Sequence, residues 1–303
     1  MKRMLLSTLN GKERNAAFQE AQLLQQLSHP NIVAYVDTLA SKTKLYLFMQ
    51  YCDSGDLEGR LEQSKKEGQM IAKPQALDWF VQMSLALQYL HQRRVLHRDL
   101  KTANVFLTAK GCGRLIVKLG DFGVSRVLSA TAELAKTFVG TPYYLSPELL
   151  MNQPYGRESD VWALGCIFYE VTTLEHPFEA ANFPSLAHKI LNDDPPLITT
   201  TRPDCDVEMD ALMLWMLTKE PSRRASLAEL LGSQARRGAD MCEGGALCER
   251  TPCGGDALWR RVSELWSAWR TREAERKRIP PAMDTHALRM LLGGRAVGPA
   301  RCE

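Results

Sequence analysis

The chain has 303 residues, 45% hydrophobic and 24% charged, a composition that excludes a disordered protein and allows one large domain or two ordinary ones. No apolar run is long enough to cross a membrane, and the apolar part of residues 1–6 is too short for a secretory signal, so we expect a cytoplasmic protein. The net charge of +3 arises in residues 235–303, where 13 Arg or Lys oppose 9 Asp or Glu, an excess too small to indicate a nucleic-acid partner.

The N-terminal segment has the pattern of a strand followed by a helix. Residues 1–6 predict the strand, and residues 12–27 predict a helix whose inner face carries apolar residues at helical spacing: Ala17, Ala21 and Leu24. Glu20 falls on the same face. A carboxylate on a buried face needs a cation, and Lys2 on the preceding strand is the expected partner.

Two more strands are predicted at residues 32–36 and 44–50, with a polar turn at 38–43 between them. A further short strand is expected at 115–119. Apolar residues at helical spacing then predict a series of helices, at about 74–94, 161–169, 185–191, 207–219 and 227–231. Strands first and helices after indicate an α+β protein with two lobes.

The most informative stretch is HRDLKTANVF at residues 97–106, followed by Asp121-Phe122-Gly123 after the strand at 115–119. Its side chains include one carboxylate to accept a proton and one lysine, together with two oxygen-bearing groups suited to a metal: Asp99, Lys101, Asn104 and Asp121. Catalysis of phosphoryl transfer consists mostly of positioning and charge neutralisation. The spacing therefore predicts a phosphoryl-transfer site.

These motifs resemble the catalytic and metal-binding loops of eukaryotic protein kinases. The resemblance implies that Asp99 accepts the proton of a substrate hydroxyl, that Lys101 neutralises the γ-phosphate of ATP, and that Asn104 and Asp121 bind Mg²⁺. By the same likeness Lys2 holds the α- and β-phosphates and is oriented by Glu20. The adenine site lies at a hinge between the lobes, formed by Met49, Gln50, Tyr51, Cys52 and Asp56.

Residues 121–148 are rich in small polar residues and end in KTFVGTPYYLSPE, which is typical of a loop ordered by a signal. Lys101 and Thr141 resemble the serine/threonine class. Together with the hinge sequence YCDSGDL, the motifs over residues 1–232 are most similar to those of the NIMA-related (NEK) kinases. This resemblance suggests that the protein associates with the cytoskeleton. The chain would then phosphorylate Ser and Thr hydroxyls of protein substrates.

The NEK resemblance also assigns regulatory and structural residues. Thr137 would be an activating phosphosite and Arg98 the cation that receives its phosphate, although Thr137 also fits a loop threonine without a role. Phe122 and Thr141 belong to the same regulatory set. The structural set comprises Asp160, which would anchor the backbone of the catalytic loop, and an ion pair at the base of the large lobe between Glu148 and Arg224.

One departure from the family is the absence of a Gly-rich loop before Lys2, where a kinase would cradle the phosphates of ATP. The expected fold is therefore a kinase-like fold with a truncated N-lobe sheet and a mainly helical C-lobe. Two interpretations remain: an ordinary kinase that begins further upstream, or a catalytically weak docking scaffold. We favour the kinase, because a scaffold has no chemical need for the four catalytic side chains together.

The C-terminal region divides into a Gly-rich linker at 233–255 and a basic helical tail at 256–303. Apolar residues at helical spacing predict an amphipathic helix at 256–278, which would bind a partner protein or membrane surface, or pack on its own domain.

The eight cysteines are scattered, so no disulfide framework is expected. Three of them crowd together without a Cys-x-x-Cys pair or an intervening histidine, so we expect no zinc site at Cys242, Cys248 and Cys253.

Overall fold

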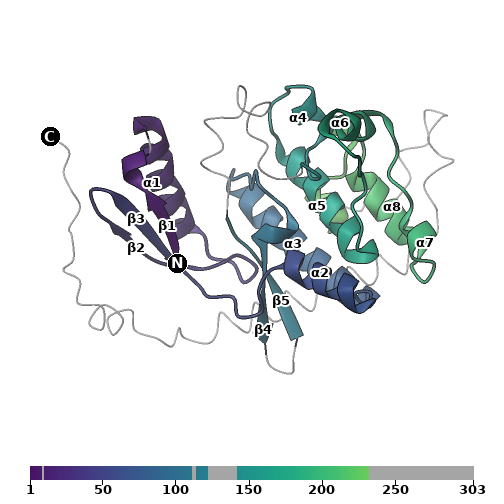
Figure 1. Cartoon of the computed structure of the whole chain (residues 1–303), viewed down its shortest axis with the longest axis horizontal. Coiled ribbons are helices and arrows are strands. Elements are labelled where there is room, and N and C mark those ends of the chain that lie inside the picture. Colours follow the sequence, from purple (N-terminus) through teal and green to yellow (C-terminus); the bar gives the residue numbers. More distant parts are fainter. Residues whose placement is uncertain (9, 111–113, 122–141, 232–303) are drawn as a thin grey trace. The chain divides into compact units, whose positions relative to one another are not determined.

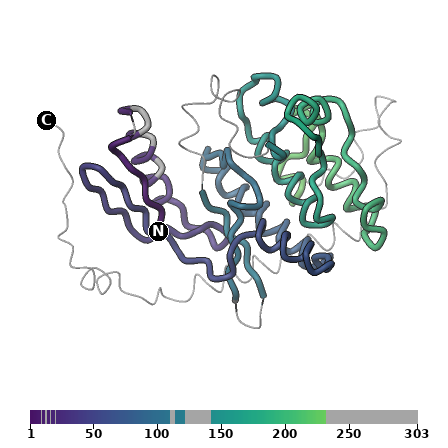
Figure 2. The backbone as a smooth tube through the Cα atoms, viewed as in Figure 1, coloured from purple at the N-terminus to yellow at the C-terminus, as the bar shows by residue number. Residues whose placement is uncertain are grey.

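The computed structural model describes residues 1–8, 10–110, 114–121 and 142–231 (Figure 1, Figure 2), apart from the side chains of Lys12, Glu13, Ala16, Glu20 and Lys110. The elements of the N-terminal part are β1 (Lys2–Leu5), α1 (Gly11–Gln26), β2 (Tyr35–Ala40) and β3 (Lys44–Met49). The remaining elements are α2 (Leu57–Glu67), α3 (Lys73–Gln92), β4 (Val105–Lys110), β5 (Arg114–Leu119), α4 (Pro147–Leu150), α5 (Arg157–Thr173), α6 (Phe183–Asn192), α7 (Ile198–Thr201), α8 (Val207–Met216) and α9 (Leu227–Leu230), with short 3₁₀ turns between some of them.

The N-terminal elements form an antiparallel sheet in the order β1-β3-β2, with α1 packed against it (Figure 1). Alternate residues of β3 are buried, as its period-two sequence predicts, and these are Leu45 and Leu47. Ala17 on α1 joins Leu45 in a small core. The inner face of α1 is the one that the helical spacing predicted.

The predicted strand at 32–36 is wrong in its position, since β2 runs from Tyr35 to Ala40. Ile32 and Val33 are buried for a different reason. Ile32 forms a parallel bridge with Leu119, and the Val33 amide donates to the Leu119 carbonyl at 2.9 Å. An apolar run that contacts another segment therefore has the sequence pattern of a strand without being one.

The part of the described chain that follows the N-terminal sheet is mainly helical and is built around α3 and α5 (Figure 1). Every residue of α5 from Ser159 to Thr173 is buried, and Phe80 of α3 contacts Phe168 of α5 with ring centres 5.0 Å apart. Burial on all sides explains why α5 lacks an amphipathic pattern. The predicted α+β class, with a small sheet and a mainly helical C-terminal part, is confirmed. Among the described residues, no helix is both long and apolar enough to span a membrane.

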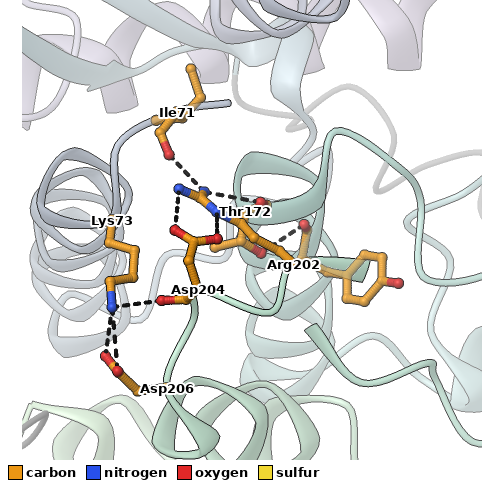
Figure 3. Close-up of polar contacts among 7 residues, drawn as sticks. Ile71, Lys73, Thr172, Arg202, Asp204 and Asp206 are labelled. Carbon is orange, nitrogen blue, oxygen red and sulfur yellow. Dashed lines mark hydrogen bonds and ion pairs between the residues drawn. The ribbon is translucent and has the colours of Figure 1, made fainter. Parts of the chain in front are cut away.

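Three elements connect through a polar cluster around Arg202, which follows α7 (Figure 3). The buried guanidinium of Arg202 donates to the carbonyl of Ile71 at 2.7 Å and to that of Thr172 at 3.2 Å, and it pairs with Asp204 at 3.0 Å. Lys73 donates to the Asp204 carbonyl at 2.8 Å and pairs with Asp206 (Figure 3). The cluster fastens the start of α3 and the end of α5 to the loop before α8.

Candidate active site

The segment that carries Asp99 is held by a buried carboxylate on α5. Asp160 accepts the backbone N–H of His97 at 3.0 Å and that of Arg98 at 3.1 Å. Arg98 has a positive φ of 65°, a conformation that L-residues adopt at a cost of about 1 kcal/mol or more. The two hydrogen bonds offset this cost, so Asp160 fixes the loop in an otherwise disfavoured shape, with the geometry that the sequence predicts.

Two side chains that the sequence analysis missed complete the environment of Asp160. His91 Nε2 lies 2.7 Å from one carboxylate oxygen, and the hydroxyl of Tyr155 donates to the other at 2.5 Å. Burial by itself raises the pKa of Asp160, but the hydrogen bond and the charge of His91 outweigh burial and lower this pKa below its ordinary value. Asp160 therefore stays ionised as the anchor of the loop.

The carboxylate of Asp99 is oriented by an amide and accompanied by a cation. Asn104 Nδ2 donates to the Asp99 carbonyl at 2.7 Å and to its carboxylate at 3.0 Å, and Lys101 Nζ lies 3.5 Å from the same carboxylate. Asn104 is buried, whereas the side chain of Asp99 is 20% exposed. A fixed, partly exposed carboxylate has the placement that a general base requires.

Asp121 follows β5 and contacts the N-terminal sheet through Lys2. Lys2 Nζ of β1 forms an ion pair with Asp121 at 3.2 Å, and both side chains are more than a third exposed. The Gly120 amide donates to the Asn104 carbonyl at 3.1 Å. A Cβ at Gly120 would lie 2.8 Å from the ring of Phe106 on β4, so a larger residue here would require that ring to shift.

The contact between Lys2 and Asp121 was not predicted. We expected Glu20 as the partner of Lys2, and α1 does carry Glu20, but its side chain lies outside the described residues. That pair stays a prediction. The observed ion pair nevertheless brings the lysine of β1 to the carboxylate expected to hold a metal.

The donor set fits a magnesium nucleotide. The amide oxygen of Asn104 and the carboxylate of Asp121 are the oxygen ligands that Mg²⁺ prefers, and Lys2 and Lys101 supply positive charge for phosphates. In the described ranges, no group of three or more His, Cys, Asp or Glu side chains is placed to hold a metal. With Asn104 and Asp121 as protein ligands, a divalent ion here would share its coordination shell with phosphates and water, as Mg²⁺ commonly does.

The expected hinge follows β3. Met49 ends the strand and the Gln50 amide donates to the Ala34 carbonyl at 2.8 Å, while Tyr51 is 84% exposed. Burial raises the pKa of the Cys52 thiol. Asp56 caps α2, because its carboxylate accepts the N–H of Gly59 at 2.8 Å. The structure thus gives Asp56 a capping role, and its expected contact with the nucleotide stays a prediction.

The expected ion pair between Glu148 and Arg224 is present. The guanidinium binds both carboxylate oxygens, at 2.8 and 2.9 Å, and the two side chains are 4% and 0% exposed. Ser159 donates to Glu148 at 2.6 Å, and Arg224 also binds carbonyls, including those of Thr218 and Lys219. The pair is fully satisfied, and it fixes the end of the segment 142–148. Phe122, Thr137 and Thr141 lie outside the described residues.

A second polar connection reaches the catalytic loop and was missed by the sequence analysis. The hydroxyl of Thr102 lies 2.8 Å from that of Tyr144, which donates to Glu170 of α5 at 2.5 Å. Burial raises the pKa of Glu170 to about 7 and also raises that of Tyr144. His176 lies 3.6 Å from Glu170 and stacks on Tyr143, with ring centres 3.9 Å apart. Separations of 26 to 42 residues leave no local sequence signal for such contacts.

An anchored carboxylate, a lysine beside it and a pair of metal-type ligands on adjoining loops form the arrangement that is typical of protein kinases. The chain belongs to the protein kinase domain family, whose model matches residues 1–234. It is 44% identical over 232 residues to the serine/threonine-protein kinase Nek4 of Mus musculus, and 42% identical over 231 residues to Nek1 of the same species. It is 40% identical over 231 residues to Nek11 of Homo sapiens. The predicted NEK resemblance is confirmed.

Each of these matches covers 76% of the chain. The matched region spans only 28% of Nek4, 18% of Nek1 and 35% of Nek11, so the chain covers about a fifth to a third of the length of these relatives.

Proposed function

We propose that this protein transfers the γ-phosphoryl group of ATP to serine and threonine hydroxyls of other proteins. The observation that carries the proposal is the carboxylate of Asp99, which is oriented by Asn104 and lies within 3.5 Å of Lys101. The names of the relatives, which are serine/threonine-protein kinases, support the same reaction. Protein substrates follow from this reaction class.

Each residue has a distinct role in the proposed reaction. The oxygen of the substrate hydroxyl attacks the γ-phosphorus, and Asp99 accepts the proton that this hydroxyl loses. The bond between the γ-phosphorus and the β,γ-bridging oxygen breaks, and ADP leaves with that oxygen. Lys101 offsets the negative charge on the transferred group. Asn104 and Asp121 would hold Mg²⁺, and Lys2, already at Asp121, would bind the other phosphates. MgATP supplies the phosphoryl group, and residues 49–52 would bind its adenine through backbone groups.

The test is the substitution Asp99→Asn in the full-length protein. Asparagine keeps the shape of the side chain but does not accept a proton, so the rate of phosphate transfer to a general protein substrate should fall by about 10²–10⁴. The free energy of unfolding should change by less than about 1 kcal/mol, because little packing is lost. A matched control is Asp37→Asn, which removes an exposed carboxylate of β2 and should leave the rate unchanged. Equal rates for the wild type and Asp99→Asn, or no transfer by the wild type, would contradict the proposal.

We also propose that Thr137 is an activating phosphosite whose phosphate is received by Arg98. Support comes from the fixed backbone of Arg98, which Asp160 holds in the loop beside Asp99. The backbone that carries this cation is therefore fixed before any phosphate arrives, which lowers the cost of ordering the loop.

For partners and location, we propose that the predicted helix at 256–278 binds a partner protein, and that the protein is cytoplasmic with association to the cytoskeleton. The apolar and basic pattern of that helix supports the partner site, and the location rests on the resemblance of the sequence motifs to the NEK kinases. A tagged chain should co-localise with cytoskeletal filaments. Removal of residues 256–303, which include the proposed partner site, should reduce this co-localisation. Diffuse staining of both forms would contradict it.

A further inference from the structure

Thr102 lies between Lys101 and Asn104 and begins the 3₁₀ turn Thr102–Asn104 at the end of the catalytic loop. The residue is completely buried. Its hydroxyl oxygen lies 2.8 Å from that of Tyr144, in the segment 142–148. The contact therefore joins the turn that carries Asn104 to a segment far along the chain.

The hydroxyl of Tyr144 is held by a second hydrogen bond. It donates its proton to the buried carboxylate of Glu170 on α5 at 2.5 Å. The ring of Tyr144 also lies edge-on to that of His176, with ring centres 6.1 Å apart. A phenol has one proton, so the oxygen of Tyr144 is left to accept the proton of Thr102. Both hydroxyl groups therefore have a fixed partner and a fixed direction.

The position of Thr102 affects that of Asn104 because the turn between them is held by few bonds. The Asn104 amide donates to the Lys101 carbonyl at 3.0 Å, and the Val105 amide donates to the Thr102 carbonyl. A 3₁₀ turn has poorer hydrogen-bond geometry than an α-helix, so contacts from outside matter to its stability. Asn104 in turn donates to the carboxylate of Asp99 at 3.0 Å. A displacement of Thr102 would thus reach the expected base of the reaction.

The contact between Thr102 and Tyr144 is more specific than the burial of a hydroxyl requires. On α5, the buried hydroxyl of Thr172 donates to the Phe168 carbonyl at 2.9 Å, within the same helix. Thr102 instead bonds to a side chain 42 residues away. A bond across this separation fastens one segment to another, in addition to satisfying a buried polar group.

We propose that Thr102 is a positioning residue for phosphoryl transfer. Its hydroxyl, held by Tyr144, fixes the turn that carries Asn104 and thereby the carboxylate of Asp99. Asp160 fixes the start of the loop, and Thr102 fixes its end. This role depends on the proposed phosphotransferase function, in which a base displaced by about 1 Å can cost about 10² in rate.

Amide hydrogen exchange tests the positioning without a measurement of activity. Thr102→Val keeps the shape of the side chain and removes the hydroxyl, so the amides of Asn104 and Val105 should exchange at least about fivefold faster than in the wild type. The amide of His97, which Asp160 holds, should exchange at an unchanged rate. Thr102→Ser keeps the hydroxyl and should keep the slow exchange. Equal exchange of Asn104 and Val105 in the wild type and Thr102→Val would overturn the proposal.

Steady-state kinetics test the consequence for the reaction. Thr102→Val should lower kcat by about tenfold and change KM for ATP by less than about threefold, because the adenine contacts expected at residues 49–52 lie elsewhere. Thr102→Ser should keep at least about half of the wild-type kcat. The matched control is Thr172→Val, which removes a buried hydroxyl that bonds within its own helix and should leave kcat within about twofold. A kcat for Thr102→Val equal to that of the wild type would overturn the proposal.

A double variant separates positioning from a general loss of stability. Tyr144→Phe removes the acceptor of Thr102, so adding Thr102→Val to it should lower kcat by less than about twofold further. A loss of about tenfold from Thr102→Val in both backgrounds would overturn the proposal. If Thr102→Val does not fold, Tyr144→Phe takes its place and should show the same changes in exchange and kcat. If the wild type transfers no phosphate, the proposed function fails, while hydrogen exchange still decides whether Thr102 fixes the turn.

Discussion

The hydroxyl of Tyr144 donates a hydrogen bond of 2.5 Å to Glu170 and lies 2.8 Å from the hydroxyl of Thr102. Because Tyr144 uses its only proton on Glu170, the hydroxyl of Thr102 must donate to Tyr144. Thr102 directly follows Lys101. The carboxylate of Glu170 thus helps to position the catalytic loop through the hydroxyl groups of Tyr144 and Thr102. If Glu170 were protonated, both hydrogen bonds could reverse their donor and acceptor.

This relationship predicts a pH dependence of stability that Glu170→Gln removes. The pKa of Glu170 is raised to about 7 by burial, above its ordinary value, so the folded state retains the proton that the unfolded state loses. The contribution of Glu170 is therefore present below the unfolded pKa and is lost as the pH rises towards 7 and beyond. Between pH 5 and 8, the wild type should lose up to about 3 kcal/mol of unfolding free energy relative to the variant.

Urea unfolding of both proteins at several pH values measures this difference. Glu170 also faces Tyr144, His176, Glu58 and Lys65, and these groups are common to both proteins, so comparison with the variant isolates Glu170 itself. A difference that stays constant from pH 5 to 8 would show that Glu170 titrates as an ordinary glutamate.

A second prediction concerns the buried ion pair. Glu148→Gln leaves the guanidinium of Arg224 buried without its counter-charge and should lower the free energy of unfolding by about 3–5 kcal/mol. Glu158→Gln is the matched control, since this neighbouring glutamate is exposed and its loss should cost less than about 1 kcal/mol. Chemical denaturation of the two variants checks the comparison, and equal losses would rule out a special role for the pair.

A third prediction follows from the polar cluster around Arg202 (Figure 3). Arg202→Met leaves the buried carbonyls of Ile71 and Thr172 without this donor and should cost about 2–4 kcal/mol. Lys73→Met removes a partly exposed ion pair with Asp206 and should cost about 1 kcal/mol or less. Thermal unfolding distinguishes the variants. If Lys73→Met is the more damaging change, the cluster does not depend on Arg202.

The fourth prediction tests the regulatory proposal for Thr137. Thr137→Ala should lower the rate of phosphate transfer, and phosphatase treatment of the wild type should lower it to a similar level, because both remove the charge expected to bind Arg98. Phosphatase treatment of Thr137→Ala should then have no further effect. Activity in all these preparations equal to that of the untreated wild type would remove Thr137 from the mechanism.

The local sequence was sufficient where chemistry lies in a short motif. The loop 97–106 and Asp121 were identified from their spacing, and the structure brings Asp99, Lys101, Asn104 and Asp121 to adjoining loops. Strand β3 was predicted closely because its buried and half-buried residues alternate. Helix α2 was missed, since only Leu57, Leu61 and Ser64 of its eleven residues are buried.

Contacts between distant segments account for several of the other differences. The residues 32–33 were assigned to a strand because their apolar character comes from contact with Leu119, far along the chain. The partners of Asp160 at His91 and Tyr155 became visible only in three dimensions, as did the link from Thr102 to Glu170. Periodicity identifies a buried face but does not identify what covers it.

Helix α5 carries both carboxylates that position the catalytic loop, Asp160 near its start and Glu170 near its end. They are about 15 Å apart along the axis, at 1.5 Å per residue. Inserting one residue between them would rotate one carboxylate by about 100° relative to the other and release the loop from one of its two supports. In this family's members, insertions and deletions should therefore accumulate in surface loops and be excluded from the interval between these two positions, even where the intervening residues vary.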